Sequence, residues 1–526
     1  MFQTSLEYYS GNVPGGIFLL VALLAITWFV LWFVFHFSKL LRLDRLILVG
    51  GICSLSICIG YVYFWFKYPP PHERQRILIL ADINPELSDS SSQTYLYQTY
   101  LYEFLKSKID LSRFLVYKPD SYLAIANWDS LKYSSYQTKL TKFMRASYVI
   151  YIRNETSSEL ITGDLLVQNQ SAGFDTTRDV LSGTPEEIEL QPGVLDIFSI
   201  DSQYSKIFTS RWPQQIQKTW AKGKLAYISK DLISAQHSYL QCLQIDEGFY
   251  TAQIELAQLD VDSAQILQAD GGYYQNHLSR ATQYLYQLRD QNIINGDVER
   301  IWGEHAILLE NFVVAEQKLK ESHKLDRFSD KLYLDLTQLH PSRYQNLKFL
   351  NEESLIRQAL FVNPASFQAI IQYSDFLNLN SRYEESENIL LQFLEVFPDQ
   401  FDVLLTLGKF YVSRQNYVDA HAIFSKMLSG NYFNKMPVKF NLGVVYFHQE
   451  DFVNAKKIFT RIATQNMNPD AFLYLAYISE KEEDIEQSIE YLRKRIRYNR
   501  GPNDRYKEEA RKRLVMLLKK QGELPN

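Results

Sequence analysis

The sequence predicts a mainly α protein built from a two-helix transmembrane hairpin, a small α/β domain and an α-solenoid of stacked helix pairs. Two long uncharged segments near the amino terminus predict the hairpin, and alternating strand-type and helix-type segments predict the α/β domain. A sequence repeat of about 34 residues across the second half predicts the solenoid.

The composition is that of a folded protein with several domains. Its 526 residues exceed one ordinary domain of about 150 residues, and 46% of them are apolar. Three cysteines, two of them in an apolar run, exclude a disulfide framework and a metal-binding quartet of cysteines. Residues 1–76 carry a net charge of +3 and residues 493–520 carry +9, which leaves −16 for residues 77–492. So acidic a body repels phosphate backbones, and we expect no nucleic-acid partner.

The first part is expected to be a membrane anchor. Segments 17–37 and 46–66 each run 21 residues without Lys, Arg, Asp or Glu. A helix of that length crosses about 30 Å of hydrocarbon. The first 16 residues contain no Lys or Arg, which argues against a signal peptide. We therefore expect a hairpin embedded in the membrane, followed by a proline-rich spacer that ends at residue 71.

The expected location is the bacterial cytoplasmic membrane, crossed twice, with the soluble region in the periplasm. The loop between the spans and the segment after the second span carry three Lys or Arg each, so the positive-inside count is nearly tied. The amino-terminal segment, whose one charged side chain is Glu7, favours a cytoplasmic loop and a soluble region on the other side.

Residues 72–210 are predicted to form the small α/β domain. Short apolar runs at 76–83, 113–118, 146–154 and 159–170 are typical of strands, and helical patterns precede the second and third of them. This order, with the strand "YVIYIR" and a second strand ending before "AGFDTTRDVLSG", resembles the amino-terminal domain of the translocation protein TolB and related FlgO-like envelope domains. An unrelated α/β domain with the same element order is the alternative.

The second half contains a repeated unit. "LGKFYVSRQNYVDAHAIF" (407–424) returns as "LGVVYFHQEDFVNAKKIF" (442–459), with Gly408 and Ala420 matching Gly443 and Ala455. Small residues at these positions let two helices approach closely. The spacing resembles the tetratricopeptide repeat, which stacks because one unit cannot bury its apolar face alone. Similar units start near residues 223, 302, 374 and 475, so we expect about seven repeats over 213–502 and a capping helix and tail over 503–526.

The resemblance implies a concave groove, lined by the first helix of each repeat, that holds a partner protein or peptide. The residues expected to line it are Leu405, Lys409, Val412, Phe440, Val444, Phe447, Leu473 and Tyr477. One cation among apolar and aromatic groups argues against the Lys and Asn clamp for a carboxyl terminus. It favours an amphipathic helix or a hydrophobic peptide. The alternative is that these side chains pack against another segment of the same chain.

The basic carboxyl-terminal region has two interpretations. Its cations are either the solvated face of a terminal helix that buries Leu514, Leu517 and Leu518, or a contact for acidic lipid headgroups.

No catalytic, cofactor or metal site is predicted. The sequence contains no P-loop, no His-Glu-x-x-His and no Gly-x-Ser-x-Gly. The leading hypothesis is a non-enzymatic, membrane-anchored scaffold that binds protein partners and organises a cell-envelope complex. The alternative is a membrane-bound sensor or regulator whose α/β domain binds a ligand and whose repeats relay its state to a partner.

Overall fold

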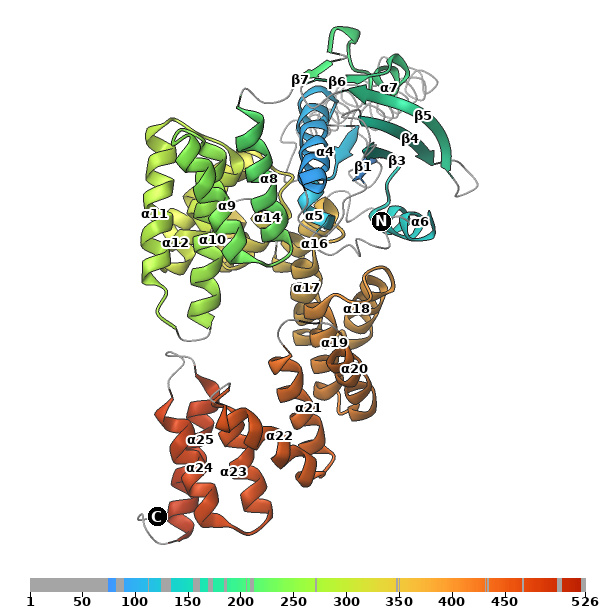
Figure 1. Cartoon of the computed structure of the whole chain (residues 1–526). Helices are drawn as coiled ribbons and strands as arrows, with labels where there is room; N and C mark the ends of the chain where they lie inside the picture. The colour runs from blue at the N-terminus through green and yellow to red at the C-terminus, as the bar shows by residue number, and fades with distance from the viewer. Residues whose placement is uncertain are drawn as a thin grey trace, which may run out of the picture. The chain divides into compact units, whose positions relative to one another are not determined.

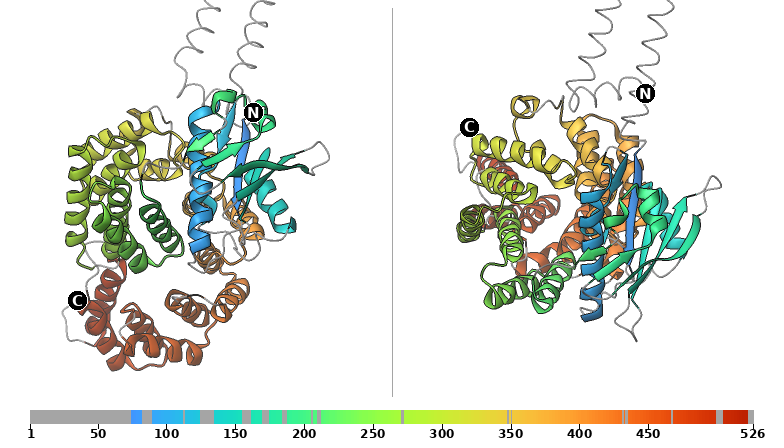
Figure 2. Two further views of the ribbon diagram at one scale, coloured as in Figure 1. Left: turned by 45° about the horizontal axis from the view of Figure 1, so that its top comes forward. Right: turned by 90° about the horizontal axis from the view of Figure 1, so that it is seen from above.

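A computed structural model of the chain describes residues 74–521, apart from gaps that include 82–88, 124–133, 155–160 and 169–173. Contacts divide the chain into two compact units. The first holds the α/β region with residues up to 245 and residues 328–364, and the second holds residues 246–327 and 365–526. Figure 1 and Figure 2 show both units as ribbons, with helices predominating in each.

The α/β region of the first unit contains one sheet of seven strands. Its elements are β1 (Gln75–Ala81), α4 (Asp89–Lys108), β2 (Phe114–Val116), α5 (Pro119–Leu123), α6 (Ser134–Met144), β3 (Tyr148–Asn154), β4 (Ile161–Gln168), β5 (Phe174–Gly183), β6 (Glu187–Leu190), α7 (Pro192–Phe198) and β7 (Lys206–Phe208). The strand order is β2-β1-β3-β4-β5-β6-β7. β2 and β3 pair in parallel with β1, and the later pairs are antiparallel.

The central strands are buried and α4 packs against them. β1 is apolar from Ile77 to Ala81, and Ile77, Leu78 and Ile79 are fully buried, as expected for a strand covered on both faces. Gln98 of α4 donates to the backbone oxygen of Ile79 at 2.7 Å, which fixes the helix over the strand. The sequence did not predict β5, β6 and β7, because a run such as "FDTTRDVLSG" lacks the apolar pattern that marks a strand.

The remaining elements are helices, most of them joined in pairs by short turns. They are α8 (Gln214–Ile228), α9 (Leu232–Ile245), α10 (Tyr250–Ala269), α11 (Gln275–Asp290), α12 (Gly296–Leu308), α13 (Phe312–Leu325), α14 (Asp330–Thr337), α15 (Pro341–Asn346), α16 (Glu352–Val362), α17 (Phe367–Leu379), α18 (Tyr383–Val396), α19 (Phe401–Ser413), α20 (Tyr417–Ser429), α21 (Met436–His448), α22 (Phe452–Thr464), α23 (Ala471–Lys481), α24 (Ile485–Arg497) and α25 (Arg505–Lys520).

The repeat spacing corresponds to a steric fit between paired helices. A Cβ atom on Gly443 would lie 2.9 Å from the Phe459 ring, and one on Gly408 would overlap the Phe424 ring. The glycine therefore admits a phenylalanine from the second helix of its own pair. In the pair α17 and α18, Ser374 takes the glycine position and Ser386 the position of Ala420, and their Oγ atoms lie 2.8 Å apart and satisfy each other.

The turns inside the pairs also repeat. Ser381, Gln415, Glu450 and Glu483 each have a left-handed backbone, with φ between 59° and 64°. The next helix then starts at a capping side chain: Asn416 and Asp451 accept hydrogen bonds from the backbone N–H of Asp419 and Asn454. Such caps satisfy the unpaired N–H groups of the first turn, so each second helix begins at a fixed residue.

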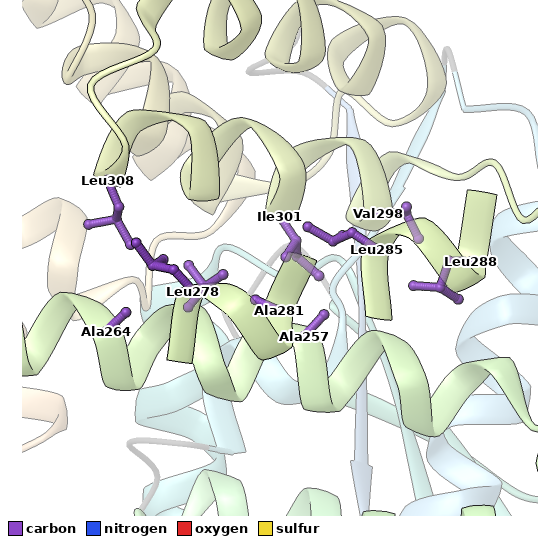
Figure 3. Close-up of a cluster of buried hydrophobic side chains, with 10 residues drawn as sticks. Ala257, Ala264, Leu278, Ala281, Leu285, Leu288, Val298, Ile301 and Leu308 are labelled. Atoms are coloured by element: carbon purple, nitrogen blue, oxygen red, sulfur yellow. The ribbon is translucent and has the colours of Figure 1, made fainter. Parts of the chain in front are cut away.

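Each group of helices is held by a continuous apolar core. In the segment α10 to α12, buried side chains from three helices meet, with Ala257 and Ala281 allowing close approach and Leu285 and Ile301 filling the interior (Figure 3). In the segment α21 to α23, Phe459 stacks on Tyr474 of the next pair at a centroid distance of 4.8 Å. Stacking of neighbouring pairs therefore buries the apolar surface that a single pair leaves exposed.

The predicted fold class and location are corrected in one respect. In the part of the chain that the structure describes, no helix combines the length and the hydrophobicity needed to cross a membrane. Two of the longest helices, α4 and α10, have 20 residues but carry polar and charged side chains along their length. The spans predicted at 17–37 and 46–66 lie outside the described residues. The structure supports a mainly α repeat protein with a small α/β region, and a two-pass membrane protein is not supported.

Candidate functional site

The candidate site is the face that the first helix of each pair presents at three fixed positions. Relative to Gly408 these are the residues three before, one after and four after, namely Leu405, Lys409 and Val412. Positions spaced by four and three residues lie on one side of a helix. The equivalent residues are Phe440, Val444 and Phe447 in α21, and Leu473 and Tyr477 in α23. We call these positions the groove face.

The eight predicted residues differ in accessibility. Phe440, Val444 and Leu473 are buried and belong to the core between pairs. The remaining five reach the surface: Lys409 is exposed, and Leu405, Val412, Phe447 and Tyr477 are partly exposed. The accessible part of the groove face is therefore apolar and aromatic, with one cation.

An aromatic cluster supports this surface. Phe447 lies edge-on to Tyr474 at 5.6 Å and also contacts Tyr477, with their centroids 6.1 Å apart. Sequence reasoning missed Tyr474, because the same position in the two preceding pairs holds the polar residues Thr406 and Asn441. Edge-to-face packing of these rings fixes Phe447 and leaves part of its ring exposed.

The capping helix α25 closes one end of the groove face. Tyr477 donates its hydroxyl hydrogen to Glu509 Oε1 at 3.2 Å, and the Arg513 guanidinium lies 5.6 Å from the Tyr477 ring centroid. Arg513 in turn pairs with Glu480 of α23 at 2.5 Å. Burial and the Glu509 carboxylate raise the pKa of Tyr477 to about 12, so this hydroxyl stays protonated and acts as a donor.

At the other end of the groove face, α17 and α19 carry side chains of opposite charge. Asp375 of α17 occupies the position equivalent to Lys409 of α19, one residue after the small residue of its pair. Partial burial raises the pKa of the Asp375 carboxyl, and the Lys409 ammonium opposes that rise. The position one residue after the small residue is therefore charged in both pairs, with opposite signs.

The first pair uses the same positions differently. Counted from Gly223 of α8, they hold Trp220, Lys224 and Tyr227. Lys224 Nζ lies 2.8 Å from Asp120 Oδ2 of the α/β region. The Trp220 ring packs near Tyr95 of α4 at 6.1 Å. At this pair the groove-face positions thus contact another segment of the same chain.

The electrostatics of that contact are those of a partly buried ion pair, with 9% of the Lys224 side chain and 23% of the Asp120 side chain exposed. Burial raises the pKa of the Asp120 carboxyl, but Lys224 and Lys118 outweigh this effect and bring it to about 2. Tyr95 also donates a hydrogen bond to Asp120. Asp120 is therefore a carboxylate at neutral pH, and its charge is balanced within the first unit.

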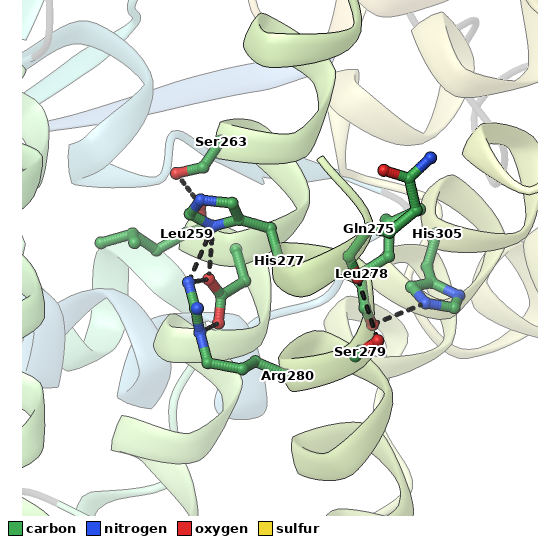
Figure 4. A network of polar contacts seen from close by, with 9 residues as sticks. Leu259, Ser263, Gln275, His277, Leu278, Ser279, Arg280 and His305 are labelled. Carbon is green, nitrogen blue, oxygen red and sulfur yellow. Dashed lines mark hydrogen bonds and ion pairs between the residues drawn. The ribbon is translucent and has the colours of Figure 1, made fainter. Parts of the chain in front are cut away.

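The helices α10 to α12 carry two buried polar networks. Asp260 is 1% exposed and accepts from Arg280 Nε at 3.1 Å, and His277 Nδ1 lies 2.8 Å from the same carboxylate (Figure 4). In α12, Arg300 donates to Glu304 at 2.9 Å, and both residues are buried. Arg280 pairs with Asp260 across α11 and α10, and Arg300 pairs with Glu304 within α12, so each carboxylate has a cation beside it.

Among the residues that the structure describes, no group of three or more His, Cys, Asp and Glu side chains is placed to hold a metal ion.

Comparison with known proteins finds similarity to solved structures only. No family model matches the sequence, and no curated protein matches it. The structure of PilF from Pseudomonas aeruginosa is 19% identical, covers 41% of this chain and 97% of its own, and has a TM-score of 0.32. Yeast Tom70 is 12% identical, covers 60% and 66%, and has a TM-score of 0.42. A tetratricopeptide repeat protein from Parabacteroides merdae is 14% identical, covers 58% and 100%, and has a TM-score of 0.30.

The assignment of the helical part rests on its own contacts. Paired helices of 13 or 14 residues recur from α17 to α22, and the repeat glycines of α19 and α21 each meet the equivalent phenylalanine of their partner helix. A left-handed residue separates the two helices of each pair. The helical part of this chain is an α-solenoid of tetratricopeptide-like helix pairs.

Proposed function

We propose that this chain is a protein-binding scaffold whose groove face on α19, α21 and α23 holds an apolar segment of a partner protein. The observation that carries this proposal is a row of partly exposed apolar side chains, Val412, Phe447 and Tyr477, on consecutive pairs. Val412 and Phe447 occupy equivalent positions, and the Phe447 ring contacts the Tyr477 ring of the next pair, so the three side chains form a strip that suits a helix or an extended peptide.

The chemistry of the strip defines its partner. A partner that buried about 400 Å² of apolar surface would gain about 10 kcal/mol before the costs of association are subtracted. The exposed Lys409 ammonium lies beside the apolar row and would favour an acidic residue next to the partner's apolar side chains. An amphipathic helix with one acidic flank meets both requirements.

The contacts of the first pair support different roles for different helix pairs of the array. Because Trp220 and Lys224 already contact the α/β region, the groove face of α8 has its occupant within the chain. We therefore assign partner binding to the later pairs. More specifically, we propose that the partner belongs to a cell-envelope complex. The support for this is the resemblance of residues 76–210 to the TolB amino-terminal domain and FlgO-like envelope domains.

Site-specific photo-crosslinking tests the assignment. A photoreactive amino acid at Lys409 should link the full chain, expressed in its native host, to a discrete partner that mass spectrometry can identify. The matched control places the same group at Val453, which is 80% exposed and is the second residue of α22. Replacing Phe447 with Ser should weaken the crosslink at Lys409. Equal crosslinking from both positions, or none that responds to Phe447→Ser, would rule out the groove face.

A second candidate function is that of a sensor, with a ligand bound by the α/β region. Its support is the strand order: β2 and β3 lie on opposite sides of β1 and both run parallel to it. In open α/β sheets, ligands bind beyond the carboxyl ends of strands where the order reverses. A screen of small metabolites against the melting of the full chain tests this function. A shift that persists in Phe447→Ser would favour the sensor, and the absence of any shift would count against it.

A further inference from the structure

The outward face of α25 is a separate surface that the proposed function does not use. The helix carries seven Lys or Arg and two Glu in 16 residues. Ala510 and Leu517 are buried, and Leu514 and Leu518 pack against the same core. The apolar side of α25 therefore packs against α23 and α24, and its opposite side faces solvent.

Three cations on that outward side form a line. Arg505, Lys512 and Lys519 are exposed and are spaced by seven residues, so they lie almost above one another along the helix. In the described part of the chain they form no ion pair, whereas the nearby Arg511 and Arg513 pair with Glu508 and Glu480. The line spans about 21 Å at 1.5 Å per residue. We call it the basic stripe.

Two apolar side chains lie among these cations. Val515 and Met516 are each 46% exposed, whereas the apolar residues Ala510 and Leu517 lie on the buried side of the helix. Both fall on the outward side, because they are three and four residues after Lys512 and four and three before Lys519. The surface therefore offers spaced positive charges and a small apolar contact in the same row.

We propose that the basic stripe docks an acidic segment of a protein partner, with Asp or Glu side chains at helical spacing and an apolar side chain between them. Charge complementarity supports this occupant: unpaired cations about 10 Å apart match carboxylates that recur every two turns of a helix. The apolar side chain of the segment would cover Val515 and Met516. This surface is distinct from the groove face, so either can fail without the other.

Other polyanions fit less well. A helix that lies in a lipid interface needs a broad apolar face, and the apolar face of α25 is already buried. A phosphate backbone would leave Val515 and Met516 without an apolar contact, and it would meet the acidic body of residues 77–492.

Binding of a defined probe to the full chain tests the proposal. The probe is a fluorescent helical peptide with Glu at seven-residue spacing and Leu between, and its control has Gln at the Glu positions. Replacing Arg505, Lys512 and Lys519 with Gln should weaken binding of the Glu peptide about tenfold, since charge contacts across an interface are lost. The matched control replaces Lys320, Lys324 and Lys481, which are also exposed, with Gln and should leave binding unchanged.

A second variant tests the apolar contact. Val515→Ser with Met516→Ser should weaken binding of the Glu and Leu peptide while leaving unchanged an all-polar peptide of equal charge. Circular dichroism should show the same helix content in every variant. Equal affinity of the two triple variants would overturn the proposal. It would also be overturned if phosphatidylserine vesicles or single-stranded DNA bound in a stripe-dependent manner and the acidic peptide did not.

Discussion

Lys224 and Asp120 form an ion pair of 2.8 Å that joins the first repeat helix to the α/β region. Lys224 occupies the groove-face position that Lys409 occupies in α19, yet it is 9% exposed in its side chain whereas Lys409 faces solvent. The same position in the repeat therefore serves as an internal contact in one pair and as accessible surface in another. The difference arises from what the chain places opposite each pair.

The first prediction concerns this ion pair. Lys224→Met should leave the Asp120 carboxylate without its partner and lower the free energy of unfolding of the first unit by about 2 kcal/mol. Lys218→Met, in the same helix and less buried, should change it by less than about 0.5 kcal/mol. Hydrogen exchange of α4 and α8 measures the effect. Equal protection in both variants would show that the pair does not hold these helices together.

The same pair predicts a pH dependence. The pKa of Asp120 in the folded protein is about 2, below the ordinary value of 3.8. A lowered pKa contributes stability that is fully present above pH 4 and is lost as the pH falls towards 2. The difference in melting temperature between the natural chain and Asp120→Asn should therefore shrink over that interval. A difference that stays constant from pH 5 to about pH 2 would contradict this assignment.

The second prediction concerns the repeat glycines. Gly443→Ala should destabilise the array by about 1 to 3 kcal/mol, because its Cβ would lie 2.9 Å from the Phe459 ring. Combining it with Phe459→Leu should cost less than the sum of the two single changes, as measured by urea unfolding. Gly193→Ala is the control, since nothing lies within 4 Å of its Cβ position. Strict additivity would exclude a direct contact between Gly443 and Phe459.

The third prediction concerns the left-handed turns. Gln415 has a φ of 60°, a conformation that glycine adopts without strain and a β-branched residue does not. We expect melting temperatures to rank Gln415→Gly above the natural chain and Gln415→Val lowest, with about 1 to 2 kcal/mol between the extremes. The neighbouring Arg414, with a φ of −89°, serves as the control. If Val ranked equally at both positions, the turn would not require a positive φ.

The fourth prediction concerns a buried arginine. Arg495 is fully buried and lies 2.7 Å from Asp470 and 2.5 Å from Asp504, which caps α25. Arg495→Met should cost about 3 to 5 kcal/mol, because two buried carboxylates lose their cation. Proteolysis should then cut first around α25. Arg511→Met removes an exposed pair and should cost less than about 1 kcal/mol. Similar cleavage of the two variants would argue against a role for Arg495 in holding the cap.

Several features of the fold could be read from the sequence for a local reason. Gly408, Gly443 and their partners recur at a fixed spacing because two helices can approach closely only at a small residue. Helix starts such as Asn416 and Asp451 could also have been predicted, since Asn and Asp cap first turns through their own side chains. The strand β5 was missed because its side chains are mostly polar.

The candidate site was predictable only in part. Phe440 and Leu473 occupy groove-face positions by sequence spacing, but both are buried, because the neighbouring pairs stack over them. Tyr474 belongs to the site although its position is polar in other repeats. Spacing assigns a residue to one side of a helix, whereas accessibility depends on how much of that side the next pair covers.

The sequence by itself determined the repeat, its small residues and the helix pairs, because these depend on contacts between residues close in the chain. Tertiary structure alone decided that Lys224 meets Asp120, more than 100 residues earlier, and that Arg495 is enclosed by two carboxylates. It likewise decided that Lys409 and the basic stripe stay exposed. Burial and ion pairing depend on which segments, distant in the sequence, pack against a given surface. The local pattern of residue types does not specify that packing.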